Sequence, residues 1–474
     1  MKKILTSLAA LLCLVQGPIY AQHESRNWFF GNNAALSFAG ASPVALAGSS
    51  MVTYEAAASV SDPAGNLLFY TNCVNIWNRN HQLMTNGQTI GGHESATQGA
   101  VIVRRPGSAS QYFVFAVDGC DNQLVGGLKY SVVDMTQQGG LGSVTSRANQ
   151  LSTVSLTEKL TAVRHANGRD TWVLVHGWQT DAFLAYLVSP AGVSTTPVIT
   201  NIGSIHTGGG GSFGNANAVG YMKASPVGNK LALAQRDSRF ELFDFNNATG
   251  QLSNFVPLTQ DYRSYGVEFS PDGSRLYGTT LDGNKIYQFN LLAGSAAAIA
   301  ASATQVGTTP SFSMYAGALQ LGPDGKIYVA LHNSSYLGMI ASPNTLGTAC
   351  AYNSTGPSLG GRLSQLGLPN FPNAFGATVL GTASAPLSVQ TALYPNPTQG
   401  SNKLLVSLPV PLRQQTVIVT LLDALGTTVA HYRMTAAQLQ ADPLALPLPA
   451  LAKGAYTVQI AGQAGTVNKK LIVE

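Results

Sequence analysis

The sequence has little charge, few cysteines and only one long apolar run. Asp, Glu, Lys and Arg make up 10% of its 474 residues, and basic residues gather in nothing larger than pairs such as Arg104-Arg105 and Lys469-Lys470. The basic surface needed to neutralise a phosphate backbone is therefore missing, which argues against nucleic acid as a partner. No stretch reaches the roughly 20 apolar residues of a membrane helix, so we expect no transmembrane segment.

Signatures of metal and phosphate chemistry are also missing. The sequence contains no His-Glu-x-x-His, no Cys-x-x-Cys and no phosphate loop. The run Gly208–Gly211 lacks the following Lys and the strand-to-helix context of such a loop. No catalytic residue is assigned from spacing alone.

The first residues, 1–21, are typical of a secretory signal peptide. Lys2 and Lys3 precede an apolar run from Ile4 to Val15, and cleavage is expected after Ala21. Removing the two lysines from the formal net charge of +5 leaves +3. The roughly 450 remaining residues suffice for a large domain and a small one. Their abundant Gly, Ser, Thr, Asn and Gln suit an all-β extracellular protein.

One short unit recurs along the chain: an apolar strand, a tight turn containing Gly, and a second apolar or aromatic strand. In these turns Pro fixes φ, Asp or Asn bonds its own backbone, and Gly accepts a positive φ. Successive turns lie roughly 40 to 60 residues apart, the period of a four-stranded propeller blade. Their glycines are Gly65, Gly107, Gly168, Gly228, Gly273 and Gly325.

Six hairpins are explicit, and fragments on either side of them supply material for a seventh blade. Asn27–Phe38 precedes the first hairpin, and Leu366–Phe371 and Phe375–Val379 follow the last. A composite blade made from both ends would remove the open sheet edges of the ring. We therefore predict an all-β fold with a seven-bladed β-propeller over residues 22–380, with six blades as the alternative.

The last part of the chain has a different pattern. After a small, uncharged linker at 381–391, the segment 392–474 alternates strand-like runs without helix signals, which suggests an immunoglobulin-like β-sandwich. Its motifs resemble the type A C-terminal sorting domain of the type IX secretion system, which carries folded proteins across the outer membrane of certain Gram-negative bacteria. The resemblance rests on Tyr394, Pro395, Asn396, Pro397, Gly400, Gly454, Tyr456, Lys469 and Lys470.

This resemblance implies the type IX secretion machinery as a partner. It also implies passage through the periplasm to a secreted or outer-membrane surface location, and it leaves open whether the mature protein is anchored or released. The turns Ser270–Gly273 and Pro323–Gly325 further resemble those of WD-like and lactonase-like propellers. With the segments Asn27–Gly31 and Gly367–Phe371 they are similar to propeller ectodomains of type IX cargo proteins, a resemblance that implies a fold but no particular activity.

Loops that enter each blade, and loops that join its second and third strands, gather on one face of a propeller, where binding sites usually lie. The side chains on these loops are of the kind that bind a sugar or a peptide, although each could also be an ordinary solvated residue. The ligand-binding candidates are His93, Glu94, Asp118, Asp121, Trp178, His206, Arg236, Asp237, Tyr262, Arg263, Tyr265, Asp282 and His332.

A metal site is not predicted. His93, Glu94, His206 and His332 could ligate a metal only if they met across the channel, and their spacing is not diagnostic. Calcium would suit the plentiful Asp and Asn side chains. No cofactor is predicted.

Three polar residues share one position relative to the turns. Lys223, Glu268 and Gln320 each lie five residues before a turn glycine. We expect them to line the channel near the opposite mouth and to hydrogen-bond between blades.

Three cysteines remain once Cys13 is removed with the signal peptide. In an oxidising compartment this odd number allows one disulfide and one leftover thiol. Cys73 and Cys120 each follow the second strand of neighbouring blades, so we predict that they form the disulfide and that Cys350 stays free.

The leading hypothesis for function is a secreted or cell-surface protein that binds a glycan or protein ligand. The alternative is a secreted propeller enzyme of the lactonase, lyase or hydrolase type, and a structural role is a third. A clustered acid/base pair or a metal in the channel would favour the enzyme, and no such pair stands at a recognisable spacing. The sequence leaves ligand identity and oligomeric state open.

Overall fold

The computed structural model describes residues 23–258, 263–373, 391–398, 403–408, 410–413, 416–423, 427–440, 443–462 and 465–474. The chain divides into two compact units, Met1–Val379 and Leu380–Glu474. Within the described ranges, no helix has the length and apolar character needed to cross a bilayer. The predicted signal peptide and linker lie outside these ranges.

The described part of the first unit contains seven small antiparallel sheets in chain order. The first is β1 (Asn27–Phe30), β2 (Ala34–Ser37) and β3 (Val44–Ala45), and the second is β4 (Ala58–Ser61), β5 (Leu67–Thr71) and β6 (Ile76–Asn78). The third is β7 (Ala100–Arg104), β8 (Gln111–Val117), β9 (Leu128–Asp134) and β10 (Ser143–Ser152). The fourth is β11 (Leu156–Arg164), β12 (Thr171–Gly177), β13 (Ala182–Ser189), β14 (Gly192–Val193) and β15 (Val198–Asn201).

The fifth sheet is β16 (Met222–Ala224), β17 (Lys230–Gln235), β18 (Arg239–Asn246) and β19 (Gln251–Pro257). The sixth is β20 (Ser264–Phe269), β21 (Arg275–Thr280), β22 (Lys285–Asn290) and β23 (Thr304–Thr308). The seventh is β24 (Ala316–Leu321), β25 (Ile327–Leu331), β26 (Gly338–Ile340) and β27 (Tyr352–Asn353). Short helices in the connections are η1 (Cys120–Asn122), η2 (Gln138–Gly140), η3 (Ala216–Ala218), α2 (Ala296–Ala301) and η4 (Gly347–Cys350).

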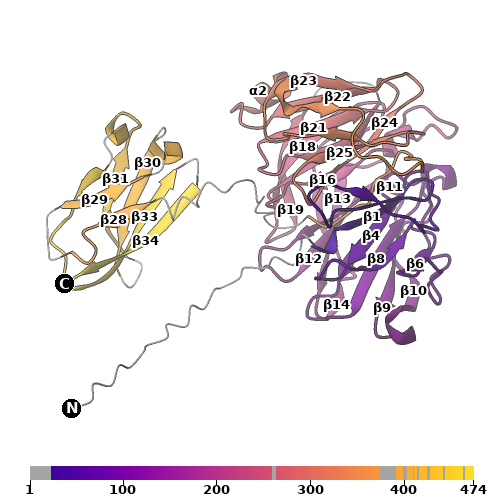
Figure 1. The fold of residues 1–474 in the computed structure, drawn as a ribbon, viewed down its shortest axis with the longest axis horizontal. Coiled ribbons are helices and arrows are strands. Elements are labelled where there is room, and N and C mark those ends of the chain that lie inside the picture. Colours follow the sequence, from indigo (N-terminus) through magenta and orange to yellow (C-terminus); the bar gives the residue numbers. More distant parts are fainter. Residues whose placement is uncertain are drawn as a thin grey trace, which may run out of the picture. The chain divides into compact units, whose positions relative to one another are not determined.

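These sheets form a seven-bladed β-propeller. The first strands of successive sheets lie next to one another, and Figure 1 shows β4, β11 and β16 toward the middle of the unit. All six turn glycines named above have φ between +70° and +90°, so the repeated hairpins are formed as the sequence predicts. We call the end of the channel where these turns lie the lower end, and the opposite end the upper end.

The core of the propeller lies between neighbouring blades. One apolar cluster joins the third and fourth sheets through Val101, Phe115, Val173 and Tyr186. Inner strands such as β4 and β20 are buried at every residue, because one blade covers each face of the next. This stacking explains why the inner strands read as continuous apolar runs and do not alternate.

The two ends of the propeller meet in the first blade, as predicted, but their described residues share one bridge and no continuous ladder. The segment Leu363–Phe371 runs alongside β1, with a single bridge between Asn32 and Leu363 at one end and ring packing of Phe371 on Trp28, 6.1 Å between centroids, at the other. Trp28 also packs on Tyr328 of β25 at 5.6 Å, which joins the first and seventh blades. Phe375–Val379 lie outside the described residues.

The backbone of this segment instead bonds to neighbouring blades. Leu366 N–H donates to Tyr54 O (2.9 Å), Ala318 N–H donates to Leu366 O (2.8 Å), and Asn370 N–H donates to Ala57 O (2.9 Å). Gly367 is packed directly against the backbone of Glu55, where a Cβ atom would be 1.5 Å from a carbonyl oxygen, so no other residue fits. We call Leu363–Asn373 the channel segment.

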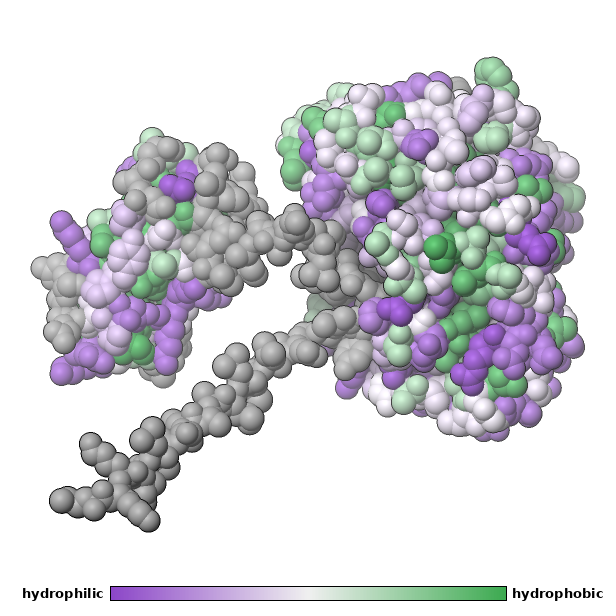
Figure 2. Space-filling model, viewed as in Figure 1, coloured by the Kyte–Doolittle hydropathy of each residue, from purple (hydrophilic) through white to green (hydrophobic). Residues whose placement is uncertain are grey.

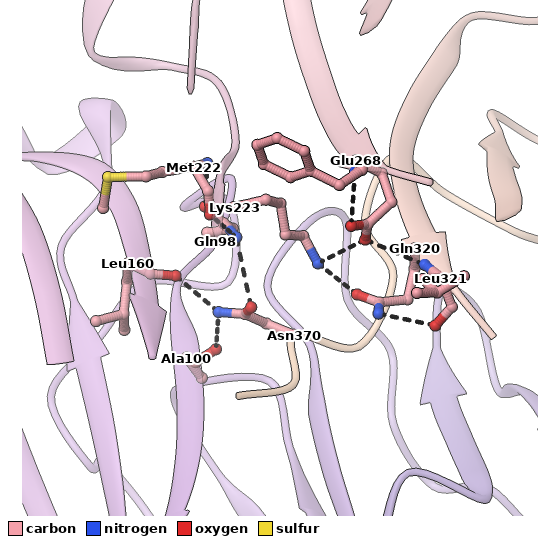
Figure 3. Close-up of polar contacts among 10 residues, drawn as sticks. Gln98, Ala100, Leu160, Met222, Lys223, Glu268, Gln320, Leu321 and Asn370 are labelled. Carbon is pink, nitrogen blue, oxygen red and sulfur yellow. Dashed lines mark hydrogen bonds and ion pairs between the residues drawn. The ribbon is translucent and has the colours of Figure 1, made fainter. Parts of the chain in front are cut away.

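Asn370 ties the channel segment to two further blades. Its amide Nδ2 donates to Ala100 O (3.0 Å) and Leu160 O (2.8 Å), while Gln98 Nε2 donates to its Oδ1 (3.4 Å), as Figure 3 shows. The side chain is 2% exposed. One short amide therefore satisfies backbone groups of the third and fourth sheets inside the channel.

The predicted contacts among Lys223, Glu268 and Gln320 are confirmed. Lys223 Nζ donates to Gln320 Oε1 and lies 3.5 Å from Glu268 Oε2, which also accepts from Leu321 N–H at 3.1 Å (Figure 3). The three residues come from the fifth, sixth and seventh sheets. They link these blades near the lower end of the channel.

The predicted disulfide is wrong. Cys73, Cys120 and Cys350 are free thiols. Cys73 Sγ is buried and bonds to His93 O (3.1 Å), whereas Cys120 Sγ is directed to Asn215 O (3.4 Å). His93, whose carbonyl accepts from Cys73 Sγ, also packs against Gly119, next to Cys120.

The second unit is the small β-sandwich that the sequence predicts. One sheet has the order β28 (Ala392–Tyr394), β29 (Lys403–Ser407), β32 (Leu444–Pro447), and the other has the order β31 (Thr428–Met434), β30 (Val417–Leu422), β33 (Gly454–Gly462), β34 (Gly465–Val473). Its short helices are α4 (Val410–Arg413) and η5 (Gln438–Gln440). Leu404 and Val406 from the first sheet share a core with Val419, Ile460 and Leu471 from the second.

Candidate functional site

The upper end of the channel brings charged groups together from different blades. Arg236 follows β17, Asp282 follows β21, and Arg263 immediately precedes β20. The guanidinium group of Arg263 donates to Asp282 Oδ2, and Arg236 Nη2 lies 3.7 Å from the same oxygen. Two guanidinium groups thus share one carboxylate, which leaves one positive charge of this group uncompensated.

An aromatic cluster is near these charges. His332, after β25, lies 5.5 Å from Tyr315 in a stacked arrangement and 5.7 Å from Tyr54 in an edge contact. Burial and the carboxyl group of Glu55 raise the pKa of the Tyr54 hydroxyl, whereas Arg236 lowers it, so the two groups of side chains are within electrostatic reach. We call Tyr54, Arg236, Arg263, Asp282, Tyr315 and His332 the upper mouth.

Backbone strain occurs at this same place. Arg263 has φ of +91°, a conformation that is costly for a residue with a Cβ atom. Its N–H donates to Arg236 O, which ties the sixth blade to the fifth. Such strain is retained where surrounding contacts fix it, and it often accompanies a functional surface.

A buried carboxyl group lies beneath the upper mouth. Glu55 accepts from Tyr265 Oη (2.7 Å) and from Ser95 Oγ (3.2 Å). Burial, followed by the nearby carboxylate of Glu158, raises the pKa of Glu55 to about 8. Glu158 is itself held by Thr97 Oγ1 (2.6 Å) and by Cys120 N–H (2.6 Å).

This arrangement predicts a pH dependence of stability that Glu55→Gln removes. Between the ordinary Glu pKa of 4.5 and about 8, the folded state holds a proton on Glu55 that the unfolded chain releases. Stability therefore falls as pH rises through this window, by up to about 1.4 kcal/mol per pH unit for one such group. The glutamine side chain keeps an oxygen for Tyr265 and never ionises.

Denaturant unfolding at pH 5 and pH 8 measures the effect. We expect the variant to gain stability relative to the wild-type protein at pH 8 and to lose that advantage at pH 5. Glu94→Gln, at an exposed carboxylate in the adjacent loop, should follow the wild-type curve. Parallel curves for wild type and Glu55→Gln would contradict the assignment.

The sorting motif lies in the second unit, where Asn396 joins the start of this unit to its last strand. Its Nδ2 donates to Lys470 O (2.7 Å), and its Oδ1 accepts from Ile472 N–H (2.9 Å). Tyr456 Oη donates to Ala452 O (2.9 Å), and Gly454 pairs with Val473 in the β33–β34 ladder. The motif residues thus hold the last strand in place. Lys469 also lies on that strand, Pro395 and Pro397 flank Asn396, and Gly400 is outside the described residues.

Comparison with known families decides what this unit is. Residues 392–474 match the secretion system C-terminal sorting domain. The chain is a cargo of the type IX secretion system. The cargo protein is therefore exported to the cell surface or secreted, and the secretion machinery is its partner during export.

The remaining comparisons concern solved structures. A candidate 6-phosphogluconolactonase from Bacteroides uniformis is 12% identical with a TM-score of 0.39, over 84% of this chain and 95% of that one. The periplasmic gluconolactonase PpgL of Pseudomonas aeruginosa is 14% identical with a TM-score of 0.37, over 77% and 89%. PorZ, a surface component of the type IX system of Porphyromonas gingivalis, is 12% identical with a TM-score of 0.36, over 94% and 59%. A search of curated proteins finds no similar sequence.

Several of the predicted ligand-binding residues of the cargo protein meet at the upper mouth. Arg236, Arg263, Asp282 and His332 belong to it, and Tyr265 lies directly beneath, fully buried. Tyr262 is outside the described residues. Tyr54, Tyr315 and Glu55 are not among the predicted candidates.

Other candidates have roles in the structure of the loops. Asp118 accepts from Gly119 N–H, Asn122 Nδ2 and Gly126 N–H, which closes the loop containing the exposed Asp121. Asp237 accepts from Gly210 N–H (2.6 Å). His93 packs against Gly119 and Trp178 is half-buried, while Glu94 is exposed and its carbonyl accepts from Glu55 and Ala56 N–H.

His206 is not at the mouth. It is fully buried between the fourth and fifth blades, stacked on His176 at 3.9 Å, with its Nε2 3.9 Å from Glu241 Oε2. Burial lowers the pKa of both imidazoles, to about 3 for His176, and raises that of Glu241 to about 7. No group of three or more metal-ligating side chains in the described part of the chain is arranged to hold a metal ion.

The sequence also contains a spacing that resembles a catalytic motif. Gly210, Ser212 and Gly214 have the Gly-x-Ser-x-Gly spacing of a nucleophile elbow. The structure places Ser212 in an exposed loop between β15 and η3, without the strand-to-helix turn that such an elbow requires. The spacing therefore does not identify a nucleophile.

Proposed function

We propose that this cargo protein is a binding protein that recognises an extracellular protein through its upper end. The observation that carries the proposal is the placement of exposed apolar side chains. Eight of them lie on loops of the upper end: Val52, Tyr54, Val125, Val154, Ile205, Phe213, Phe312 and Tyr336. Aromatic and Arg side chains at the centre of an apolar surface are typical of protein interfaces.

The shape and chemistry of this end favour a protein over a glycan. The cavity beside Tyr54 and Glu94 is about 260 Å³, smaller than the roughly 300–1,000 Å³ that is typical of small-molecule sites. Tyr315 and His332 stack on each other, which leaves fewer ring faces for a sugar. Figure 2 shows apolar and polar residues interleaved on the visible face of the propeller unit.

The enzyme alternative lacks comparable support. Glu55 and Glu158 are close enough to affect each other's ionisation, but both carboxyl groups are buried and held by protein hydrogen bonds. A catalytic acid must reach its substrate within hydrogen-bond distance. The contacts of this pair support a role in holding the second, third, fourth and sixth blades together.

The test compares two pairs of exposed residues at opposite ends of the propeller. Tyr54→Ser with Phe312→Ser alters upper residues that are 43% and 87% exposed, and Val227→Ser with Leu292→Ser alters lower residues that are 53% and 71% exposed. The exported protein is immobilised and incubated with surface proteins of its own cells and, separately, with a glycan array. We expect the upper pair to lower binding of a specific protein at least 10-fold and the lower pair to leave it unchanged.

Two results would overturn the proposal. Equal retention of every surface protein by both double variants would show that the upper end is not the binding surface. Binding to the glycan array that the upper pair abolishes, without a protein partner, would assign a glycan ligand.

A further inference from the structure

A large cavity of the propeller unit lies at its lower end, opposite the upper mouth. Its volume is about 660 Å³, within the range of roughly 300–1,000 Å³ that is typical of small-molecule sites. The hairpin turns of the third and fourth sheets, 105–109 and 164–171, form its rim, and the channel segment forms one side through Phe371–Asn373. We call this cavity the lower pocket.

The lower pocket is lined by an excess of cationic side chains. Arg104, Arg105, Arg164, Arg169 and Lys223 face Glu24 and Glu268, so five positive charges meet two negative ones. Three cations have carboxylate partners: Arg104 with Glu24 (3.6 Å), Lys223 with Glu268 (3.5 Å), and Arg169 with the neighbouring Asp170 (2.8 Å). In the described residues Arg105 and Arg164 form no ion pair, although the charge of Arg164 is near enough to Glu24 to oppose the rise that burial causes in the pKa of that carboxyl group.

These two arginines differ in how many of their guanidinium hydrogen-bond donors are already used. Arg105 donates to Pro190 O and to Gln111 Oε1, so neutral acceptors occupy its guanidinium group. In the described part of the chain, the guanidinium group of Arg164 has neither a hydrogen bond nor an ion pair; only its backbone N–H is bonded, to Asn373 Oδ1 (2.9 Å). Arg164 therefore brings an unused planar donor to the pocket.

The rest of the lining is suited to a sugar ring. Apolar groups of Ile102, Pro226 and Phe371 form part of the wall, and Phe371 is half-buried, with Trp28 as its one aromatic contact among the described residues. Ser108 and Thr161 add hydroxyl groups. A sugar presents apolar C–H faces and hydroxyl groups, which match such a wall.

We propose that the lower pocket binds a small acidic saccharide, with its carboxylate on Arg164 and its ring against the apolar wall. A guanidinium group pairs with a carboxylate in a two-bonded, planar geometry that a neutral sugar cannot offer. The excess positive charge of the rim adds attraction that salt weakens. The site is separate from the upper mouth, so this inference does not depend on the proposed protein partner.

Calorimetric titration of the exported protein tests the proposal, with digalacturonate as the acidic probe and maltose as a neutral disaccharide. We expect digalacturonate to bind at least 10-fold more tightly than maltose, and more weakly as salt increases. Arg164→Gln should weaken digalacturonate at least 10-fold and Arg164→Lys less. Arg147→Gln, at an exposed arginine on the outer strand β10, should leave it unchanged.

The melting temperature of each variant identifies loss of folding, which is not expected because, among the described residues, the Arg164 guanidinium group forms no hydrogen bond or ion pair. Absence of digalacturonate binding, or equal binding to wild type and Arg164→Gln, would overturn the proposal. Inorganic phosphate that binds as tightly as digalacturonate, with the same dependence on Arg164, would replace the saccharide with a simple anion site.

Discussion

Cells that produce the protein without Leu393–Glu474 should retain it in the periplasm, folded but absent from the surface. The reason is that the propeller and the sorting unit have separate apolar cores, so removing one does not open the other. The removed residues contain nearly all of the matched sorting domain. Cell fractionation with limited proteolysis measures both location and folding, and we expect loss of nearly all surface protein.

A fusion provides the matched control for this deletion. Residues 380–474 attached to an unrelated folded reporter with a signal peptide should carry that reporter to the surface. Surface display of the truncated protein at the wild-type level would rule out the assigned role of the tail. Degradation in the periplasm would instead show that the propeller needs the tail for its stability.

Asn370→Ala should destabilise the propeller by about 3 kcal/mol. The change leaves Ala100 O and Leu160 O without their donor inside a buried channel, and each unsatisfied group costs about 1–3 kcal/mol. Denaturant unfolding should show a lower midpoint with an unchanged slope. Asn353→Ala, at an exposed residue of the outer strand β27, should change stability by less than about 0.5 kcal/mol.

An unchanged midpoint for Asn370→Ala would contradict the role of the channel segment. A lower midpoint together with a second transition would mean that the segment detaches before the ring unfolds. That outcome would place the bonds of Asn370 in a local opening and not in the global unfolding step.

The sequence predicts the repeated part of this fold because each hairpin carries its own turn chemistry. Gly273 and Gly325 adopt positive φ, and Lys223 and Glu268 meet as their shared position implies. These features depend on short segments with a fixed register. The sorting motif is readable for the same reason, since Asn396 lies in a compact, recurring pattern.

Contacts between distant loops could not be read in this way. The sequence predicts His206 and Asp118 on loops of the binding face, but these loops fold back, and His206 is enclosed between two blades. The predicted disulfide failed for a similar reason, because adjacent loops need not direct their Sγ atoms at each other. The lower pocket arises where several turns meet, so no single stretch of sequence marks Arg164.

The channel segment also determines how a pull on the tail would reach the propeller. Tension along the backbone would pass through Asn373, whose N–H donates to Ala162 O and whose Nδ2 donates to Ser225 O (both 3.0 Å). The force would then act on the hydrogen bonds that Asn370 and Leu366 form with other blades. Because these hydrogen bonds reach several blades around the ring, a force on the tail is distributed over several blades.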